Sequence, residues 1–294
     1  MSTPQKNTIR TFAQRKERGE RLVLVTAYDY PTARLADGAG VDAILVGDTL
    51  GMVVLGYDTT IPVTVEEMLH HVKAVARARP RALIIADLPF LSYQANDDDG
   101  VRNAGRMLKE GGAGAVKVEG GERVVPLVRR LVSAGIPVMG HIGMTPQSVN
   151  QFGSFRVQGR ARGDAGRLLE EARLLADAGC FAIVIEMAPA ELAARITETV
   201  SVPTIGIGAG PDCDGEIQVM HDLLGLFDRF VPRHTRQYAV LSEIASEALQ
   251  QYVADVRAGR FPTEANTFHE CDLADPGDWD PLLQRAAETL RAQS

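Results

Sequence analysis

The chain has few cysteines, and their spacing excludes a disulfide framework and argues against a structural zinc site. Cys180, Cys213 and Cys271 are the three cysteines among 294 residues, and none belongs to a CxxC pair. A chain of this length buries enough surface to fold without disulfide bonds. The cysteine usage therefore favours a reducing compartment, and we expect a cytoplasmic protein.

Three further absences narrow the class of function. The N-terminal sequence MSTPQKNTIRTFAQRKERGE lacks the apolar stretch of a secretory signal. No apolar run approaches the roughly 18 residues that a membrane-spanning helix needs. The net charge of −7 comes without an extended basic tract, which disfavours nucleic acid as a partner. We therefore expect a protein that handles small metabolites, without a membrane or nucleic-acid partner.

What the sequence does contain is a repeated pattern of small residues, an apolar run and a polar residue. The small residues are typical of a helix C-terminus, and the segments before them carry apolar residues at helical spacing. Apolar strands that alternate with amphipathic helices predict a parallel sheet covered on both faces. The predicted strands lie within 21–29, 39–48, 81–89, 111–120, 134–143, 178–187 and 202–210, with a weaker one around 217–225.

About eight such units in roughly 240 residues predict an α/β fold of the (β/α)8 TIM barrel type. A doubly wound open sheet is the competing fold, but the GxGxxG motif is absent after the first strand. The glycine-rich turn at 206–210 comes late and lacks that spacing. We expect residues 1–262 to form the barrel with an N-terminal helix. Residues 263–294 are expected to be an extension that wraps the surface or a neighbouring subunit.

Two long connections interrupt the regular spacing of the units. They cover residues 48–64 and 144–166. Long loops after barrel strands are usually lids or binding loops. The second loop carries Arg156, Arg160 and Arg162, which either form a solvated face or contact an anionic ligand.

Carboxylates stand at the ends of several predicted strands, where barrel enzymes have their active sites. Asp48, Asp87, Glu119 and Glu186 each close an apolar run. Lys117 lies two residues before Glu119, so both side chains point to the same face of their strand. Carboxylates that are buried together repel one another unless a cation or protons compensate. Lys117, bound protons or a divalent cation would do so, and an all-oxygen ligand set favours Mg²⁺, or Mn²⁺, over zinc.

Simpler structural roles compete with catalysis at these positions. A single inward carboxylate is more often a helix N-cap or a loop anchor, whereas four at matching places in the repeat favour a shared site. His141 also closes a strand, and it fits a hydrogen-bonded core histidine as well as a catalytic residue. A structural ion pair of Lys117 and Glu119 that plugs the barrel is the less favoured alternative.

The chain carries, in order from about residue 8 to 269, the motifs TAYDYPTA, VGDTLGM, IPVTVEEM, ADLPF, NAGRMLKEGGAGAVKVEGG, GHIGMTPQSVNQFGSFRVQGR, IGIGAG, DGEIQVMHDLLG and FPTEANTFH. Together these motifs resemble those of the ketopantoate hydroxymethyltransferase family. The resemblance implies a (β/α)8 barrel that assembles as a decamer. It also implies transfer of a hydroxymethyl group from 5,10-methylenetetrahydrofolate to 3-methyl-2-oxobutanoate. The product would be 2-dehydropantoate (ketopantoate), in the first step toward pantothenate and coenzyme A.

The resemblance also implies roles for individual residues. The Mg²⁺ ligands correspond to Asp48 of VGDTLGM, Asp87 of ADLPF and Glu119 of VKVEGG. The proton acceptor corresponds to Glu186 of IVIEMAP. The residues expected to meet the keto acid are Asp48, Thr49, Asp87 and Lys117, with Thr49 standing where many family members have Ser.

The implied mechanism passes through a Mg²⁺-stabilised enolate. Chelation of the 2-oxo and carboxylate oxygens would polarise the carbonyl group. Glu186 would remove the C3 proton, with burial raising its basicity, while Lys117 would offset the charge of the substrate carboxylate. The sequence does not identify the residues that contact the folate, and the loops at 144–166 and 206–210 are only candidates.

Two other functions remain as alternatives to this reaction. The first is a Mg²⁺-dependent C–C lyase of the isocitrate lyase and phosphoenolpyruvate mutase type, which also acts on 2-oxo acids. It is disfavoured because the KKCGH-type loop of those lyases is missing. The second is a catalytically inactive barrel that serves as a scaffold, which is disfavoured because all four strand-end carboxylates are present.

Overall fold

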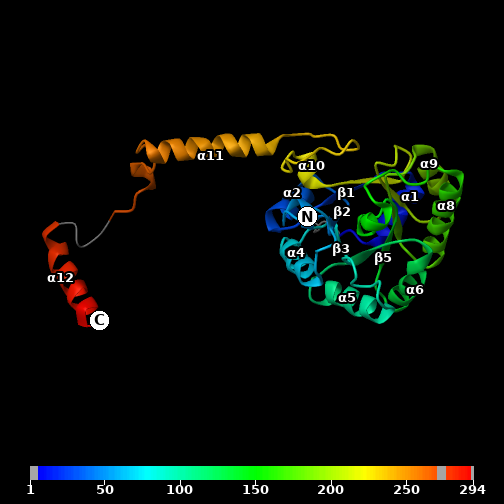
Figure 1. Cartoon of the computed structure of the whole chain (residues 1–294), viewed down its shortest axis with the longest axis horizontal. Coiled ribbons are helices and arrows are strands. Elements are labelled where there is room, and N and C mark those ends of the chain that lie inside the picture. The colour runs from blue at the N-terminus through cyan, green and yellow to red at the C-terminus, as the bar shows by residue number, and fades with distance from the viewer. Residues whose placement is uncertain (1–5, 270–275, 293–294) are drawn as a thin grey trace, which may run out of the picture. The chain divides into compact units, whose positions relative to one another are not determined.

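The computed structural model describes residues 6–269 and 276–292, and its first unit is built on a closed barrel of eight parallel strands (Figure 1). Each strand pairs in parallel with the next one along the chain, and β8 pairs with β1. Helices connect most of the strands, so the predicted TIM barrel is confirmed. The strands are β1 (Leu22–Thr26), β2 (Ala43–Val46), β3 (Leu83–Asp87), β4 (Ala115–Glu119), β5 (Val138–Gly143), β6 (Ala182–Glu186), β7 (Thr204–Ile207) and β8 (Gly215–Gln218).

Polar caps fix where several helices begin. The Asp29 side chain accepts a hydrogen bond from the Thr32 N–H at the start of α2, and Thr64 forms a capping box with Glu67 at the start of α4. No helix in the described part of the chain has the length and hydropathy to cross a membrane. The main helices of the barrel unit are α1 (Ile9–Arg18), α2 (Tyr30–Ala39), α4 (Val65–Arg77), α5 (Asp97–Lys109), α6 (Val125–Ser133), α8 (Arg162–Asp177) and α9 (Ala190–Thr199). Shorter helices are α3 (Leu50–Val53), α7 (Val149–Phe152) and α10 (Met220–Leu223), with 3-10 turns at Glu122–Val124, Pro146–Ser148 and Glu264–Asn266.

Side chains alternate between two apolar cores along each strand. Ile44 packs in the core between the sheet and the surrounding helices, whereas its neighbour Leu45 packs in the core inside the barrel. Phe12 of α1 belongs to the inner core and packs edge-on against Phe181, with ring centroids 5.2 Å apart. Positions that share the phase of Leu45 therefore point into the barrel, which decides where the polar strand-end residues lie.

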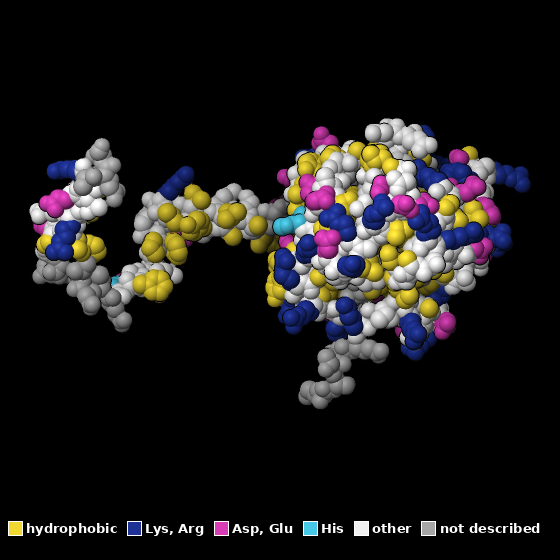
Figure 2. All heavy atoms as spheres, turned by 90° about the horizontal axis from the view of Figure 1, so that it is seen from below, with side chains coloured by type: hydrophobic (Ala, Val, Ile, Leu, Met, Phe, Trp, Pro, Cys, Tyr) yellow, Lys and Arg dark blue, Asp and Glu magenta, His cyan; other side chains and the backbone are white. Residues whose placement is uncertain are grey.

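The residues after Leu241 form a second compact unit. It contains α11 (Leu241–Arg257) and α12 (Pro276–Ala292). The first unit ends at Leu241, whereas the division expected from the sequence at residue 262 stays a prediction. Figure 2 shows hydrophobic side chains gathered along this second unit. Those of α11 include Ile244, Leu249, Tyr252, Val253 and Val256.

Candidate active site

Six charged or titratable side chains meet inside the barrel at the carboxyl ends of its strands. Asp87 lies two residues after Ile85 on β3, and Lys117 and Glu119 lie two and four residues after Ala115 on β4. Ile85 and Ala115 belong to the inner core, so these three side chains also point into the barrel. All but Glu186 are less than 5% exposed, and the Glu186 side chain is 16% exposed. The structure thus brings together the residues that the sequence singled out. The side chains lining this inner pocket include Asp48, Thr49, Asp87, Lys117, Glu119, His141 and Glu186.

Lys117 is the centre of the charge network in the inner pocket. Its Nζ lies 2.9 Å from Asp87 Oδ1, 3.6 Å from Glu119 Oε1 and 3.0 Å from His141 Nδ1. Burial favours the neutral amine, but the charges of Asp87, Glu119 and Asp48 outweigh it and raise the pKa of Lys117 above its ordinary value. Lys117 therefore stays a charged ammonium group inside the barrel.

The carboxylates in the inner pocket outnumber the lysine. Burial, followed by the charges of Asp87 and Glu119, raises the pKa of Asp48 well above its ordinary value. Burial also raises the pKa of Asp87, although Lys117 opposes the shift. Glu119 differs, because Lys117, His141 and the Gln147 N–H outweigh burial and lower its pKa. Three carboxylates beside one ammonium leave an excess of negative charge, which protons or a second cation must balance.

Gln147, on the turn after β5, holds two of these carboxylates in place. Its Nε2 donates to Asp48 Oδ2 and to the Leu88 carbonyl oxygen, both at 2.9 Å, and its backbone N–H donates to Glu119 Oε2 at 3.0 Å. Its Oε1 accepts a hydrogen bond from the Tyr93 hydroxyl at 2.9 Å. Sequence reasoning identified the loop but missed this residue, because a glutamine in a loop carries no signal of what it will contact.

His141 and Glu186 form the other side of the inner pocket. His141 Nε2 lies 3.2 Å from Glu186 Oε2, and its Nδ1 lies 3.5 Å from Glu119 Oε1. Burial and Lys117 lower the pKa of His141, but Glu119 and Glu186 raise it more, so the net shift is upward. Gly143 (φ 91°) lets β5 run close to β6, since a Cβ atom there would collide with the Glu186 carbonyl oxygen. The structure therefore places His141 among the active-site carboxylates.

The three expected metal ligands do not surround a single point in this structure. No group of three or more His, Cys, Asp or Glu side chains within residues 6–269 and 276–292 is placed to hold a metal ion. Lys117 Nζ lies between Asp87 and Glu119, and Gln147 holds an oxygen of Asp48. Asp87 Oδ1 and Glu119 Oε1 are nevertheless buried, and Lys117 Nζ, at 2.9 Å and 3.6 Å, is their cationic neighbour. Two such oxygens suit Mg²⁺, which commonly takes one or two carboxylates and completes its shell with water and substrate oxygens.

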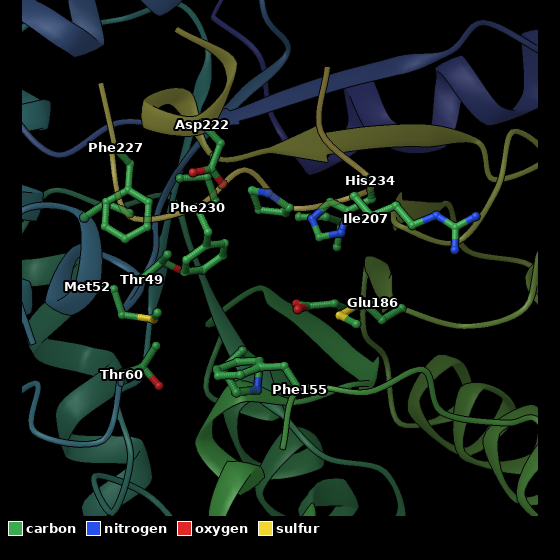
Figure 3. A pocket seen from close by; sticks show the side chains of 16 residues that line it. Thr49, Met52, Thr60, Phe155, Glu186, Ile207, Asp222, Phe227, Phe230 and His234 are labelled. Carbon is green, nitrogen blue, oxygen red and sulfur yellow. The ribbon is translucent and has the colours of Figure 1, made fainter. Parts of the chain in front are cut away.

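A larger cavity of about 310 Å³ adjoins the inner pocket (Figure 3). Thr49, Pro146, Glu186, Ile207 and Val219 line both spaces, so the two are continuous. Side chains that line only the larger cavity include Met52, Phe155, Asp222, Phe227, Phe230 and His234. We call this space the outer cavity.

Comparisons with known proteins agree with the sequence motifs. The family profile described as ketopantoate hydroxymethyltransferase matches residues 6–264. The 3-methyl-2-oxobutanoate hydroxymethyltransferase of Moorella thermoacetica is 59% identical over 91% of this chain and 100% of its own. The Carboxydothermus hydrogenoformans protein of the same name is 56% identical over 89% of this chain and 95% of its own.

Solved structures show the same barrel at low sequence identity. A 2,3-dimethylmalate lyase of the PEP mutase/isocitrate lyase superfamily has a TM-score of 0.56 and 16% identity, covering 99% of both chains. A phosphonopyruvate hydrolase solved with oxalate and Mg²⁺ has a TM-score of 0.57 and 15% identity, covering 97% of both chains. These likenesses show the fold alone. The family profile and the 59% identity establish the family: the chain belongs to the ketopantoate hydroxymethyltransferases, which are transferases.

Proposed function

We propose that the chain transfers a hydroxymethyl group from 5,10-methylenetetrahydrofolate to 3-methyl-2-oxobutanoate, forming ketopantoate for pantothenate and coenzyme A synthesis. The observation that carries this proposal is the position of Glu186. Its carboxylate lies where the charged inner pocket meets the outer cavity (Figure 3). A base at that boundary can act on a carbon acid bound on one side and present it to a one-carbon donor bound on the other.

The inner pocket has the groups that a 2-oxo acid requires. The Lys117 ammonium offsets the charge of the keto acid carboxylate, and the Thr49 hydroxyl is available to donate a hydrogen bond to it. Asp87 and Glu119, with Asp48, would hold Mg²⁺, which when bound supplies Lewis-acid polarisation of the 2-oxo group. The fold neighbour solved with oxalate and Mg²⁺ supports this assignment, because oxalate resembles the carboxylate end of a 2-oxo acid.

Glu186 removes the proton from C3 of the keto acid in this proposal. Its Oε2 lies 3.2 Å from His141 Nε2, so the histidine orients the carboxylate from the pocket side. Water adds to the methylene carbon of the folate, both of its C–N bonds break as the two nitrogens take up protons, and tetrahydrofolate leaves. The carbanion equivalent at C3 attacks the resulting one-carbon aldehyde, a C–C bond forms, and the oxygen that came from water takes up a proton to become the new hydroxyl group.

The direct test is formation of ketopantoate by the purified full-length chain. Product should appear with 3-methyl-2-oxobutanoate, 5,10-methylenetetrahydrofolate and Mg²⁺ together. EDTA should abolish it, and added Mg²⁺ should restore it. Absence of product under these conditions would refute the proposal. Folate-independent cleavage of a branched malate would instead favour a C–C lyase.

We also infer a homo-oligomer in the cytoplasm, with the decamer of the family as the expected size. The apolar side chains of α11 that face solvent in one copy support an assembled state. Cys180 and Cys213 are free buried thiols, which suits a reducing compartment. Light scattering of the full chain tests the assembly, and a monomeric mass at micromolar concentration would contradict it.

A further inference from the structure

Asp222, on α10, is a buried carboxylate that the reaction in the inner pocket does not use. It is 7% exposed, and its side chain makes no hydrogen bond or ion pair with any other residue that the structure describes. Burial alone raises its pKa from the ordinary 3.8 to about 6. Buried carboxylates without partners are costly and rare in folded proteins. A partner for Asp222 is therefore to be sought in a ligand of the outer cavity, into which its carboxylate points (Figure 3).

Aromatic rings make up much of the wall around Asp222. Phe227 and Phe230 pack edge to face, with ring centroids 5.4 Å apart and an interplanar angle of 83°. Phe155 contributes a third ring from the loop after β5. Phe155 and Phe230 are 45% and 53% exposed, which is unusual for large apolar rings unless a ligand covers them. Such walls suit a flat heteroaromatic ring that needs hydrogen bonds along one edge only.

The outer cavity is also the route by which a second reactant reaches Glu186. Thr49, Glu186 and Ile207 line both the cavity and the inner pocket. A ring seated in the outer cavity would therefore have a path to the keto acid. The segment that closes the cavity is held to the barrel by hydrogen bonds from Thr235 Oγ1 to Gln218 Oε1 (2.9 Å) and from the Tyr238 N–H to the Leu223 carbonyl (2.8 Å).

We propose that Asp222 accepts two N–H hydrogen bonds from the amino-pyrimidinone edge of the tetrahydrofolate ring, while Phe155 and Phe230 contact the ring faces. The inference rests on the proposed function. That edge presents an amino group beside a ring N–H, and the spacing of these two donors matches the spacing of the two oxygens of a carboxylate. Paired hydrogen bonds to a charged carboxylate are strong. Recognition of the donor is thus assigned to the α10 region and the segment after it, in addition to the loop at 144–166.

The test compares tetrahydrofolate with its 2-desamino-2-methyl analogue, which lacks the amino group of that edge. Calorimetric titration of the full chain with Mg²⁺ should show that the wild type prefers tetrahydrofolate. In Asp222→Asn, affinity for tetrahydrofolate should fall about 10- to 100-fold, while the analogue, which keeps only the ring N–H, should lose clearly less. Asp228→Asn is the matched control, because Asp228 is exposed and does not line the cavity. Equal affinities of wild type and Asp222→Asn for tetrahydrofolate would overturn the assignment.

A second variant separates ring recognition from a structural effect at Asp222. Phe230 is exposed on the cavity wall, so Phe230→Ala should fold normally. It should weaken tetrahydrofolate and the desamino analogue alike, by about tenfold, because it removes a stacking contact and no hydrogen bond. If Asp222→Asn weakens both ligands by the same factor, Asp222 has no specific role at the amino edge and the inference is wrong.

Wild-type controls distinguish this inference from the proposed function. If wild type forms no ketopantoate, the proposed function fails irrespective of how Asp222 variants behave. If the wild type forms ketopantoate and Asp222→Asn binds tetrahydrofolate as tightly as the wild type does, only the assignment of Asp222 fails.

Discussion

The inner pocket and the outer cavity lie side by side and are built in opposite ways. In the inner pocket, Lys117 lies within 3.6 Å of two carboxylates, and most of the polar groups come from strand ends. In the outer cavity, Asp222 stands without a partner on a largely apolar wall that also carries Glu186, Arg233 and His234. Rigid strands give the precision that proton transfer needs, whereas loops give a wide surface for a large ligand. The contrast predicts that substitutions in one region leave the function of the other intact.

The largest effect is expected from Glu186→Gln, at the boundary between the two regions. Removal of the base should lower kcat for ketopantoate formation about 10²- to 10⁴-fold. Calorimetry should show tetrahydrofolate affinity close to that of wild type, because Glu186 contributes only one wall of the outer cavity. Glu191→Gln, an exposed glutamate in the first turn of α9, is the control. A wild-type kcat for Glu186→Gln would remove Glu186 from the mechanism.

Lys117→Met should cause the largest loss of stability, because it leaves the buried carboxylates without the cation that compensates their charge. Urea unfolding should show a decrease of about 3–5 kcal/mol. Lys73→Met is the control, since Lys73 forms an exposed pair with Glu110 at 3.8 Å and should cost less than about 1 kcal/mol. Equal losses in the two variants would mean that the inner network does not depend on the ammonium group.

Gln147→Leu tests whether the loop after β5 positions the inner carboxylates. Asp48 Oδ2 and the Leu88 carbonyl would lose a donor at 2.9 Å, at a cost of about 1–3 kcal/mol. The KM for the keto acid should rise, while the affinity for tetrahydrofolate stays unchanged. Gln151→Leu, on the exposed side of α7, provides the comparison. An unchanged KM would show that Asp48 is positioned without Gln147.

The smallest expected effect is the pH dependence of stability at Asp222. Because burial raises the Asp222 pKa from 3.8 to about 6, the folded state favours the protonated acid. The cost of ionisation is therefore full above about pH 6, shrinks between pH 6 and pH 4, and is absent below about pH 4. Asp222→Asn should be more stable than wild type at pH 7 by on the order of 1–2 kcal/mol, after allowance for solvent screening.

Urea unfolding at several pH values checks this prediction. The advantage of Asp222→Asn should shrink as the pH falls from 7 toward 4. Tyr28 and His221 are the titratable neighbours of Asp222. The pKa of Tyr28 lies above the range from pH 4 to pH 7, both at its ordinary value and after its upward shift. A variant that is less stable than wild type at pH 7 would show that the Asp222 carboxylate has a stabilising partner within the protein.

The inner pocket could be predicted from sequence because its determinants are local. An apolar run that ends in a carboxylate, repeated at similar intervals, predicts a buried strand. It also predicts that the carboxylate lies at the carboxyl end of that strand. The phase of Lys117 and Glu119 then places both side chains inside the barrel. The arrangement of Asp48, Asp87 and Glu119 round one ion remains a prediction from the family, because Lys117 lies between two of them here.

The outer cavity could not be predicted in the same way. Asp222, Phe227 and Phe230 lie in a short helix and an irregular segment, where no periodicity indicates which side chains face inward. Gln147 contacts Asp48 across 99 residues of sequence, a pairing that only the closed barrel creates.

The central claim is that the inner pocket activates the keto acid independently of the donor. Hydrogen–deuterium exchange at C3 of 3-methyl-2-oxobutanoate, followed by NMR with Mg²⁺ and no folate, tests it most directly. The account predicts steady exchange by the wild type and loss of exchange in Glu186→Gln. Wild-type exchange that begins only when folate is added, or exchange by Glu186→Gln at the wild-type rate, would contradict it.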